Sequence, residues 1–224
     1  MKIPILLVGT ANRHKLAEIG AILDGLPVRL LDARALPEPV NAREDGGTFE
    51  ENASQKVLQF ALAAARLPLE DRPLWALSDD SGLCVDALDG GPGVTSARYA
   101  GPERSDDRNN RKLLEALTGV PPEQRGASFV CAIACAEVPC GPGEPRVLLT
   151  ARGECRGVIG DALRGRGGFG YDPLFFIPGL GKTYAELSEA EKNRISHRGR
   201  ALLRFREAFR PLLEGAPAGQ GAHG

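Results

Sequence analysis

The sequence lacks a long hydrophobic run, a C-x-x-C pair and an excess of charge of either sign. Its N-terminal apolar run, residues 3–8, is too short for a signal peptide or a membrane span. The absence of C-x-x-C among the five cysteines excludes the usual zinc and redox motifs, and free thiols fit a reducing compartment. A net charge of −1 argues against nucleic-acid binders, which usually carry a basic excess. We therefore expect a soluble, cytoplasmic protein that binds neither membranes nor nucleic acids.

Length and composition are those of a globular protein. The 224 residues are 42% apolar and 25% charged, which suffices for a sizeable core in one large domain or two small lobes. We expect this domain to span residues 1–213. Residues 214–224 are mostly Gly, Ala, Pro and Gln with no apolar face, which predicts a disordered tail.

Apolar periodicity predicts helices that alternate with strands, around a hairpin of two long strands. The spacing of Leu16, Ile19 and Leu23 gives the first helix one apolar face, and Thr48 and Glu51 form a predicted capping box for the second. The pattern favours an α/β fold with a mixed sheet. The predicted strands are 3–8, 28–31, 74–77, 83–88, 128–137 and 147–159, and the predicted helices begin near 12, 48, 106, 188 and 196.

The most informative segment is Ser78–Leu83, in which Asp79 and Asp80 stand side by side between two apolar runs. Apolar runs that flank a polar bend predict strand, tight turn and strand. Adjacent carboxylates are costly at a strand end unless a cation pairs with them, and Mg²⁺ prefers such hard oxygen ligands. An ordinary Asx-turn explains the same residues without a metal.

A phosphate site is predicted at the first strand–turn–helix. Thr10, Asn12 and Lys15 place a hydroxyl, an amide and an ammonium around a helix N-terminus, where backbone N–H groups attract anions. The alternative is that Thr10 or Asn12 only caps the helix and that Lys15 is a solvated residue.

A second cationic group lies near the C-terminus. Lys192 precedes the pair His197-Arg198 at the predicted first turn of the last helix. A cation there opposes the helix dipole, so a bound anion or polar ligand would explain it. An ordinary surface location explains these residues equally well.

Two glutamates are candidates for a metal site. Glu44 or Glu51 could join Asp80 on a divalent metal. The capping box alone, however, explains Glu51.

Two glycine patterns match nucleotide-binding motifs in spelling only. The glycines at 165–170 lack the helix of a dinucleotide-binding fingerprint, because Pro173 follows them. The Gly-Lys-Thr at 181–183 ends like a P-loop, but Phe176 stands where the first glycine belongs.

Five sequence blocks occur in order along the chain: Thr10-x-Asn12-x-x-Lys15-x-x-Glu18, Thr48-Phe49-x-Glu51-Asn52-Ala53, Ser78-Asp79-Asp80-Ser81-Gly82-Leu83, Gly168-Phe169-Gly170-Tyr171-Asp172-Pro173 and Lys192-Asn193-x-Ile195-Ser196-His197-Arg198. Together they resemble the inosine/xanthosine triphosphate pyrophosphatase family, the enzymes that remove deaminated purine nucleotides. The resemblance covers roughly residues 3–213. Five blocks in register are highly specific, whereas no single block is.

The resemblance implies a fold and an activity. The fold would be an elongated mixed sheet flanked by helices, in two lobes with a nucleotide cleft between them. The enzyme would be a homodimer that needs Mg²⁺. It would hydrolyse dITP, ITP or XTP between the α- and β-phosphates to the monophosphate and pyrophosphate, and so cleanse the nucleotide pool.

Matching positions imply the site residues. Asp80 would be the catalytic acid–base residue and a metal ligand, with Glu44 and Glu51 as further candidate ligands. Arg43 stands where an acidic residue is sometimes found, which leaves the second metal ligand open. The triphosphate would be held by Thr10, Ala11, Asn12, Arg13, His14 and Lys15 with help from Lys192, and the rest of the nucleotide by Ser81, Phe169, Gly170, Tyr171, Asp172, His197 and Arg198.

Two rival functions stay open at this point. One is a Maf-like pyrophosphatase that acts on modified pyrimidines or other nucleotides. The other is a non-enzymatic nucleotide-binding protein or sensor. The paired acids favour an enzyme, because a mere anion binder would avoid carboxylates near phosphate.

Overall fold

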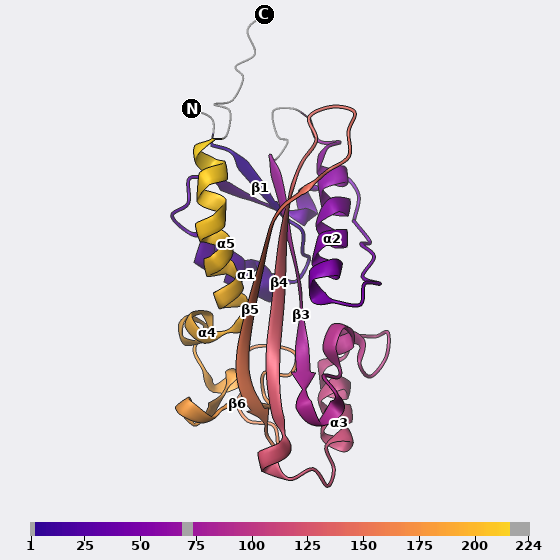
Figure 1. Cartoon of the computed structure of the whole chain (residues 1–224), viewed down its shortest axis with the longest axis vertical. Coiled ribbons are helices and arrows are strands. Elements are labelled where there is room, and N and C mark those ends of the chain that lie inside the picture. Colours follow the sequence, from indigo (N-terminus) through magenta and orange to yellow (C-terminus); the bar gives the residue numbers. More distant parts are fainter. Residues whose placement is uncertain (1–2, 69–73, 216–224) are drawn as a thin grey trace, which may run out of the picture. The chain divides into compact units, whose positions relative to one another are not determined.

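One mixed sheet of seven strands, in the order β2-β1-β3-β4-β5-β6-β7, organises the chain. The computed structural model describes residues 3–68 and 74–215 (Figure 1). β1 pairs in parallel with β2 and β3, whereas β6 pairs antiparallel with β5 and β7. The predicted α/β class, a mixed sheet with flanking helices, is therefore confirmed. The strands are β1 Ile5–Val8, β2 Arg29–Asp32, β3 Trp75–Val85, β4 Gly126–Glu137, β5 Val147–Ile159, β6 Phe175–Ile177 and β7 Lys182–Thr183, and the helices are α1 Arg13–Leu23, α2 Phe49–Ala64, α3 Asp106–Ala116, α4 Glu189–Ile195 and α5 His197–Glu214.

The chain divides into two compact units. The first unit comprises residues 1–79, 132–151 and 202–224, and the second unit comprises residues 80–131 and 152–201. Strands β3, β4 and β5 each contribute residues to both units. The chain passes from the first unit into the second at the peptide bond between Asp79 and Asp80, inside β3.

In the first unit, helices cover the strands from two sides. Figure 1 shows α1 and α5 together, with α2 on the opposite side of β3. The Arg206 guanidinium of α5 donates to the Ile22 carbonyl of α1 at 2.7 Å, and Trp75 of β3 packs edge-on against Phe209 of α5, with ring centroids 4.9 Å apart. One face of α2 is buried, at Ala53, Val57, Phe60, Ala61 and Ala64.

In the second unit, an aromatic core holds the strands and loops together. The Phe129 ring of β4 lies 4.7 Å from that of Phe175 in β6 and 5.7 Å from that of Tyr184, measured between centroids. Leu113 and Leu117, at the end of α3, are fully buried in the same cluster. The loops that follow β5 and β7 are therefore anchored to a rigid base.

The tight turn predicted within Ser78–Leu83 is wrong, because β3 continues through all of these residues. Polar residues predict a turn when their partners are unknown, but the fold supplies partners here. Asp79 forms an ion pair with Lys15, and the Leu83 N–H donates to the Ser96 hydroxyl at 2.8 Å. The polar segment can therefore stay extended inside the sheet.

The continuous strand gives Asp79 and Asp80 different surroundings. Successive side chains of a strand point to opposite faces of the sheet. Asp79 is buried, whereas Asp80 is half-buried. The two acids are therefore unlike in position and are not two copies of one catalytic group.

Local helix signals are confirmed. The predicted capping box forms at Thr48 with Glu51, and another forms at Ser188 with Glu191. The last helix begins at His197 and ends at Glu214, and the disordered tail predicted for the end of the chain lies, from residue 216 on, outside the described residues. No helix within the described ranges is long and apolar enough to cross a membrane.

Candidate active site

β1 ends at Val8, which pairs with Leu77 in the part of β3 that belongs to the first unit. Gly9 follows β1 and donates its N–H to a carbonyl of β3 at 2.7 Å. A Cβ at Gly9 would lie 2.5 Å from the Phe60 ring and from the Ser78 hydroxyl, so only glycine permits this approach. The turn of residues 10–12 is thereby held beside Leu77 and Ser78, within β3. Ligands of open α/β sheets often bind beyond the carboxyl ends of parallel strands such as β1.

This turn leads into the N-terminus of α1. The Asn12 side-chain oxygen accepts the N–H groups of His14 at 2.9 Å and Lys15 at 3.2 Å, so Asn12 is the N-cap of the helix. The Asn12 N–H donates in turn to the buried Thr10 hydroxyl at 3.2 Å. Capping, one of the two readings of this motif, is therefore confirmed for Asn12. The outer side chains of the turn are exposed, at Ala11, Asn12, Arg13 and His14.

Lys15 is not a solvated residue. Its ammonium lies 2.9 Å from the Asp79 carboxylate, and the two side chains are 15% and 1% exposed. On the other side of Asp79, the Lys56 ammonium donates to the Asp79 carbonyl at 3.3 Å and to Glu44 at 2.7 Å. Lys15 thus pairs with the buried Asp79 carboxylate, whereas Lys56 binds the Asp79 backbone and pairs with Glu44. The sequence interpretation missed Lys56, whose only signal is its position four residues after the buried Asn52 on α2.

The candidate metal ligands of the first unit have protein partners. Glu44 pairs with Lys56, and the Glu51 carboxylate accepts the N–H groups of Gly47 at 2.7 Å and Thr48 at 3.2 Å. The part of the chain that the structure describes contains no cluster of three or more His, Cys, Asp or Glu that could hold a metal. Mg²⁺ is often bound by only one or two carboxylates, together with substrate phosphates and water. Metal binding by Asp80 or Glu44 stays a prediction, and the cap accounts for Glu51.

In the second unit, the Arg198 side chain reaches the strand that carries Asp80. Arg198 is 1% exposed, and its guanidinium donates to the Ser81 hydroxyl at 2.8 Å. Ser81 directly follows Asp80 in β3. Lys192 and His197 are buried as well, at 6% and 4% exposure. The alternative of an ordinary surface location is therefore wrong for all three predicted residues.

Phe169, Asp172 and Lys192 form a second ion-paired group. The Lys192 ammonium lies 2.6 Å from the Asp172 carboxylate, which also accepts the Phe169 N–H at 2.9 Å. Lys192 lies 4.8 Å and the Arg198 guanidinium 5.7 Å from the centre of the Phe169 ring. An aromatic face with two cations beside it suits a flat ligand that carries acceptor atoms.

His197 is held by aromatic stacking. Its ring is nearly parallel to that of Phe129, with centroids 4.7 Å apart, and Tyr184 stacks on Phe129 as well. Burial raises the pKa of the Tyr184 phenol, which therefore stays neutral. These rings fix the first turn of α5 and, with it, the backbone that carries Arg198.

Tyr171 and Gly170, two further predicted site residues, form hydrogen bonds with other residues of the chain. The Tyr171 phenol is buried and donates to the Ser96 carbonyl at 2.8 Å, and its burial raises its pKa. The Gly170 N–H donates to the Asp106 carboxylate at 2.7 Å, and the Asn110 amide donates to the Gly170 carbonyl at 2.9 Å. Any substrate contact of Tyr171 or Gly170 stays a prediction.

Asp106 and Asn110 were not found from the sequence, although one signal was present. Asn110 stands three and seven residues before Leu113 and Leu117, on the buried face of α3. A polar residue in such a position indicates a partner elsewhere in the fold.

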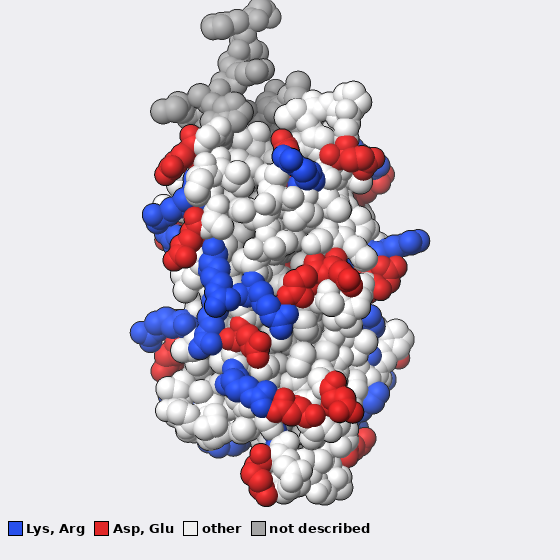
Figure 2. Space-filling view, viewed as in Figure 1, with Lys and Arg blue, Asp and Glu red and all other residues white. Residues whose placement is uncertain are grey.

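Surface charge alone does not mark the site. Figure 2 shows acidic and basic side chains interspersed on one face of the molecule. Lys15 and Lys192, by contrast, are largely covered, at 15% and 7% side-chain exposure. The predicted cationic residues Lys15 and Lys192 are therefore covered, ion-paired side chains and not part of an exposed basic patch.

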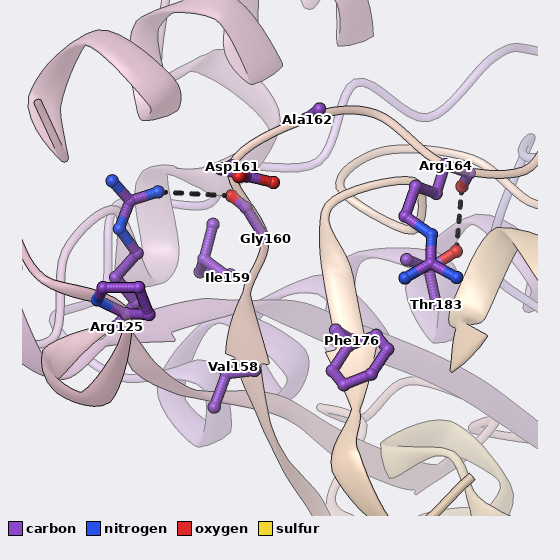
Figure 3. A pocket seen from close by; sticks show the side chains of 10 residues that line it. Arg125, Val158, Ile159, Gly160, Asp161, Ala162, Arg164, Phe176 and Thr183 are labelled. Carbon is purple, nitrogen blue, oxygen red and sulfur yellow. Dashed lines mark hydrogen bonds between the residues drawn. The ribbon is translucent and has the colours of Figure 1, made fainter. Parts of the chain in front are cut away.

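A pocket of about 250 Å³ lies elsewhere in the second unit. Its two cations already have protein partners. Arg125 donates to the carbonyls of Leu117, Val120 and Gly160, and Figure 3 shows the bond to Gly160. Arg164 pairs with Glu186. The predicted site residues do not line this pocket, so we assign it no role in the reaction. Its other lining residues are Pro122, Val158, Ile159, Asp161, Ala162, Phe176 and Thr183.

Comparisons with known proteins identify the family of the chain. The profile of the Ham1 family matches residues 6–208. The chain belongs to the Ham1 family. The dITP/XTP pyrophosphatase of Geobacter sulfurreducens is 54% identical over 197 residues, which cover 88% of this chain and 92% of that protein. The dITP/XTP pyrophosphatase of Geobacillus kaustophilus is 45% identical over 210 residues, which cover 94% and 96%.

Solved Ham1 structures share the fold. The structure of a HAM1 protein from Coxiella burnetii matches with a TM-score of 0.77 and 37% identity, over 93% of this chain and 99% of that chain. The Ham1 protein of Staphylococcus aureus matches with a TM-score of 0.75 and 35% identity, over 93% and 99%. The family resemblance read from the five blocks is therefore confirmed.

Proposed function

We propose that this Ham1-family chain hydrolyses the triphosphates of deaminated purines, dITP, ITP and XTP, to the monophosphate and pyrophosphate. The observation that carries the proposal is the buried ion pair of Lys15 and Asp79 at the N-terminus of α1, directly before Asp80 in the chain. It supplies a cation for phosphate next to a carboxylate for chemistry. The names of the related pyrophosphatases support the same substrate class.

The triphosphate is assigned to the first unit. A triphosphate carries about four negative charges, and phosphoryl transfer depends mainly on positioning and neutralising them. Lys15 is held in one orientation by Asp79, so little side-chain entropy is lost when it contacts a phosphate. The helix N-terminus and Thr10 add further donors.

Asp80 is assigned the proton transfer. Its carboxylate orients a water molecule and accepts the proton as the water oxygen bonds to phosphorus. The bond between the α- and β-phosphates breaks, and the nucleoside monophosphate and pyrophosphate are released. A divalent metal, Mg²⁺ by the family resemblance, would be held by Asp80 and would neutralise phosphate charge.

The base is assigned to the second unit, where Phe169 offers a flat ring and Arg198 and Lys192 offer donors. Hypoxanthine and xanthine carry an oxo acceptor at C6, whereas adenine carries an amino donor. A donor-lined site leaves groups unpaired when adenine binds, and such mismatches can cost on the order of 10²–10⁵ in kcat/KM.

The proposal includes a homodimer in the cytoplasm, where the nucleotide pool is used. Both rest on the family resemblance. Light scattering of the purified chain tests the dimer directly.

The deciding experiment is a panel of nucleoside triphosphates, assayed separately for pyrophosphate and orthophosphate with Mg²⁺ and with excess chelator. We expect pyrophosphate from ITP, dITP and XTP, little turnover of ATP, and none with chelator. Orthophosphate as the first product would refute the proposed bond cleavage. Preference for modified pyrimidines would favour a Maf-like activity, and binding without turnover a sensor.

A further inference from the structure

The Phe169–Gly170 backbone is clamped from one face of α3. Both backbone polar groups of Gly170 are used: its N–H donates to Asp106 at 2.7 Å, and its carbonyl accepts from Asn110 at 2.9 Å. Asp106 and Asn110 are four residues apart and so lie one above the other on the helix. A second bond ties them together, because the Asn110 amide also donates to the Asp106 carbonyl at 3.0 Å.

The clamp acts on a loop that is also held at Tyr171 and Asp172, so it adds a fixed point at Gly170 itself. Gly170 has φ +63°, a backbone conformation that residues with a side chain rarely adopt. Glycine populates positive and negative φ about equally, so the residue type alone does not fix this conformation. On its other side, Phe169 is held by the bond from its N–H to Asp172. The Phe169 ring is therefore fixed at both ends of its own residue, with Lys192 and Arg198 beside it.

Simple stabilisation of α3 does not explain Asn110. Its side chain is 4% exposed, and its Oδ1 finds no hydrogen-bond partner among the residues that the structure describes. An apolar residue would bury better beside Leu113. The burial of this amide is therefore offset through its Nδ2, which is the atom that binds Gly170.

We propose that Asp106 and Asn110 are positioning residues that set base selectivity by fixing the Phe169 ring. This inference rests on the proposed function, because it assumes that Phe169 receives the purine. Neither residue is among those proposed to bind the triphosphate, and neither takes part in the proton transfer assigned to Asp80. Their loss should therefore weaken and broaden base binding more than it slows the chemical step.

The experiment compares Asp106→Ala, Asp106→Asn and Asn110→Ala with Asp107→Ala. Asp107 is an exposed acid in the same first turn of α3, so its loss costs the helix dipole as much as the loss of Asp106 does. We expect Asp106→Ala and Asn110→Ala to raise KM for ITP about tenfold, the scale of one lost hydrogen bond, and to lower the ITP/ATP ratio of kcat/KM by a similar factor. Asp106→Asn keeps an acceptor oxygen, so its ITP/ATP ratio of kcat/KM should stay close to that of the wild type. Asp107→Ala should leave this ratio unchanged.

A second readout does not depend on activity. Hydrogen exchange of the backbone at 168–172 should accelerate in Asp106→Ala and Asn110→Ala but not in Asp107→Ala. Unchanged exchange would overturn the clamp. Faster exchange with ITP and ATP affected by equal factors would overturn its role in selectivity. If the wild-type protein fails to cleave ITP, the proposed function fails, and the exchange result still decides whether the clamp exists.

Discussion

Lys15 and Asp79 form an ion pair of 2.9 Å in which the carboxylate side chain is only 1% exposed. A charge buried to this degree is stable only with its partner, so the pair ties phosphate binding to the integrity of the first unit. The adjacent Asp80 is half-buried and is assigned the chemistry. The two acids should therefore respond differently to substitution.

Replacing Lys15 by Met should lower stability as well as activity. The Asp79 charge would be left without this partner, and breaking such a pair should cost about 2–4 kcal/mol, since Lys15 retains some solvent contact. Urea denaturation measures the loss. Arg13→Met is the matched control, because it removes an exposed cation from the same turn. Equal stability of the two variants would show that the pair contributes nothing.

Replacing Asp80 by Asn should lower kcat by roughly 10²–10⁴-fold, the range for a positioned acid–base group. The melting temperature should change little, because the amide keeps the shape of the carboxylate. Asp79→Asn should instead clearly lower the melting temperature, because the ion pair with Lys15 is broken. Near-normal turnover in a folded Asp80→Asn protein would move the proton transfer to another group.

Replacing Arg198 by Ala should reduce activity on ITP and XTP more than on ATP. The guanidinium is proposed as a donor to the C6 oxygen, which adenine lacks. Because Arg198 is buried, circular dichroism must first establish that the variant folds. Ser81→Ala removes only the hydroxyl that orients Arg198 and should narrow the ITP/ATP ratio in the same direction, by a smaller factor. Equal losses on all nucleotides would make Arg198 a phosphate contact instead.

Replacing Tyr171 by Phe should destabilise the protein by about 1–2 kcal/mol near neutral pH, because the Ser96 carbonyl loses its donor. This difference should depend on pH with a definite sign. Burial raises the pKa of Tyr171 in the folded state, so above about pH 10 the unfolded chain binds fewer protons than the folded one and stability falls.

The Phe variant lacks this proton. The advantage of the wild type should therefore shrink by about 1.4 kcal/mol per pH unit above pH 10. Chemical denaturation of both proteins at pH 8, 10 and 11 measures the trend. A difference that is constant over this range would contradict the buried, neutral phenol.

Features with local causes could be predicted from the sequence. The capping box of Thr48 and Glu51 forms as expected because it needs only four consecutive residues. The apolar face of α2 is buried because its 3.6-residue period leaves one stripe to cover. The five motif blocks identified the family because their order and spacing are properties of the chain itself.

Features that depend on partners far away in the sequence could not be predicted from the sequence. The polar segment Ser78–Leu83 predicts a turn on its own, and only the presence of Lys15 and Ser96 beside it lets it remain a strand. That strand, in turn, separates the roles of Asp79 and Asp80, because alternate side chains of a strand face opposite ways.

The sequence by itself determined the family, the fold class and the helix starts, because propensity, period and motif act over short stretches of chain. The tertiary structure alone decided which of those residues are paired. Lys192 meets Asp172 across 20 residues, Asn110 meets Gly170 across 60, and Arg198 meets Ser81 across 117. Hydrogen bonds and ion pairs of this kind have no local signal, because they form only once packing has brought distant segments within about 3 Å of each other.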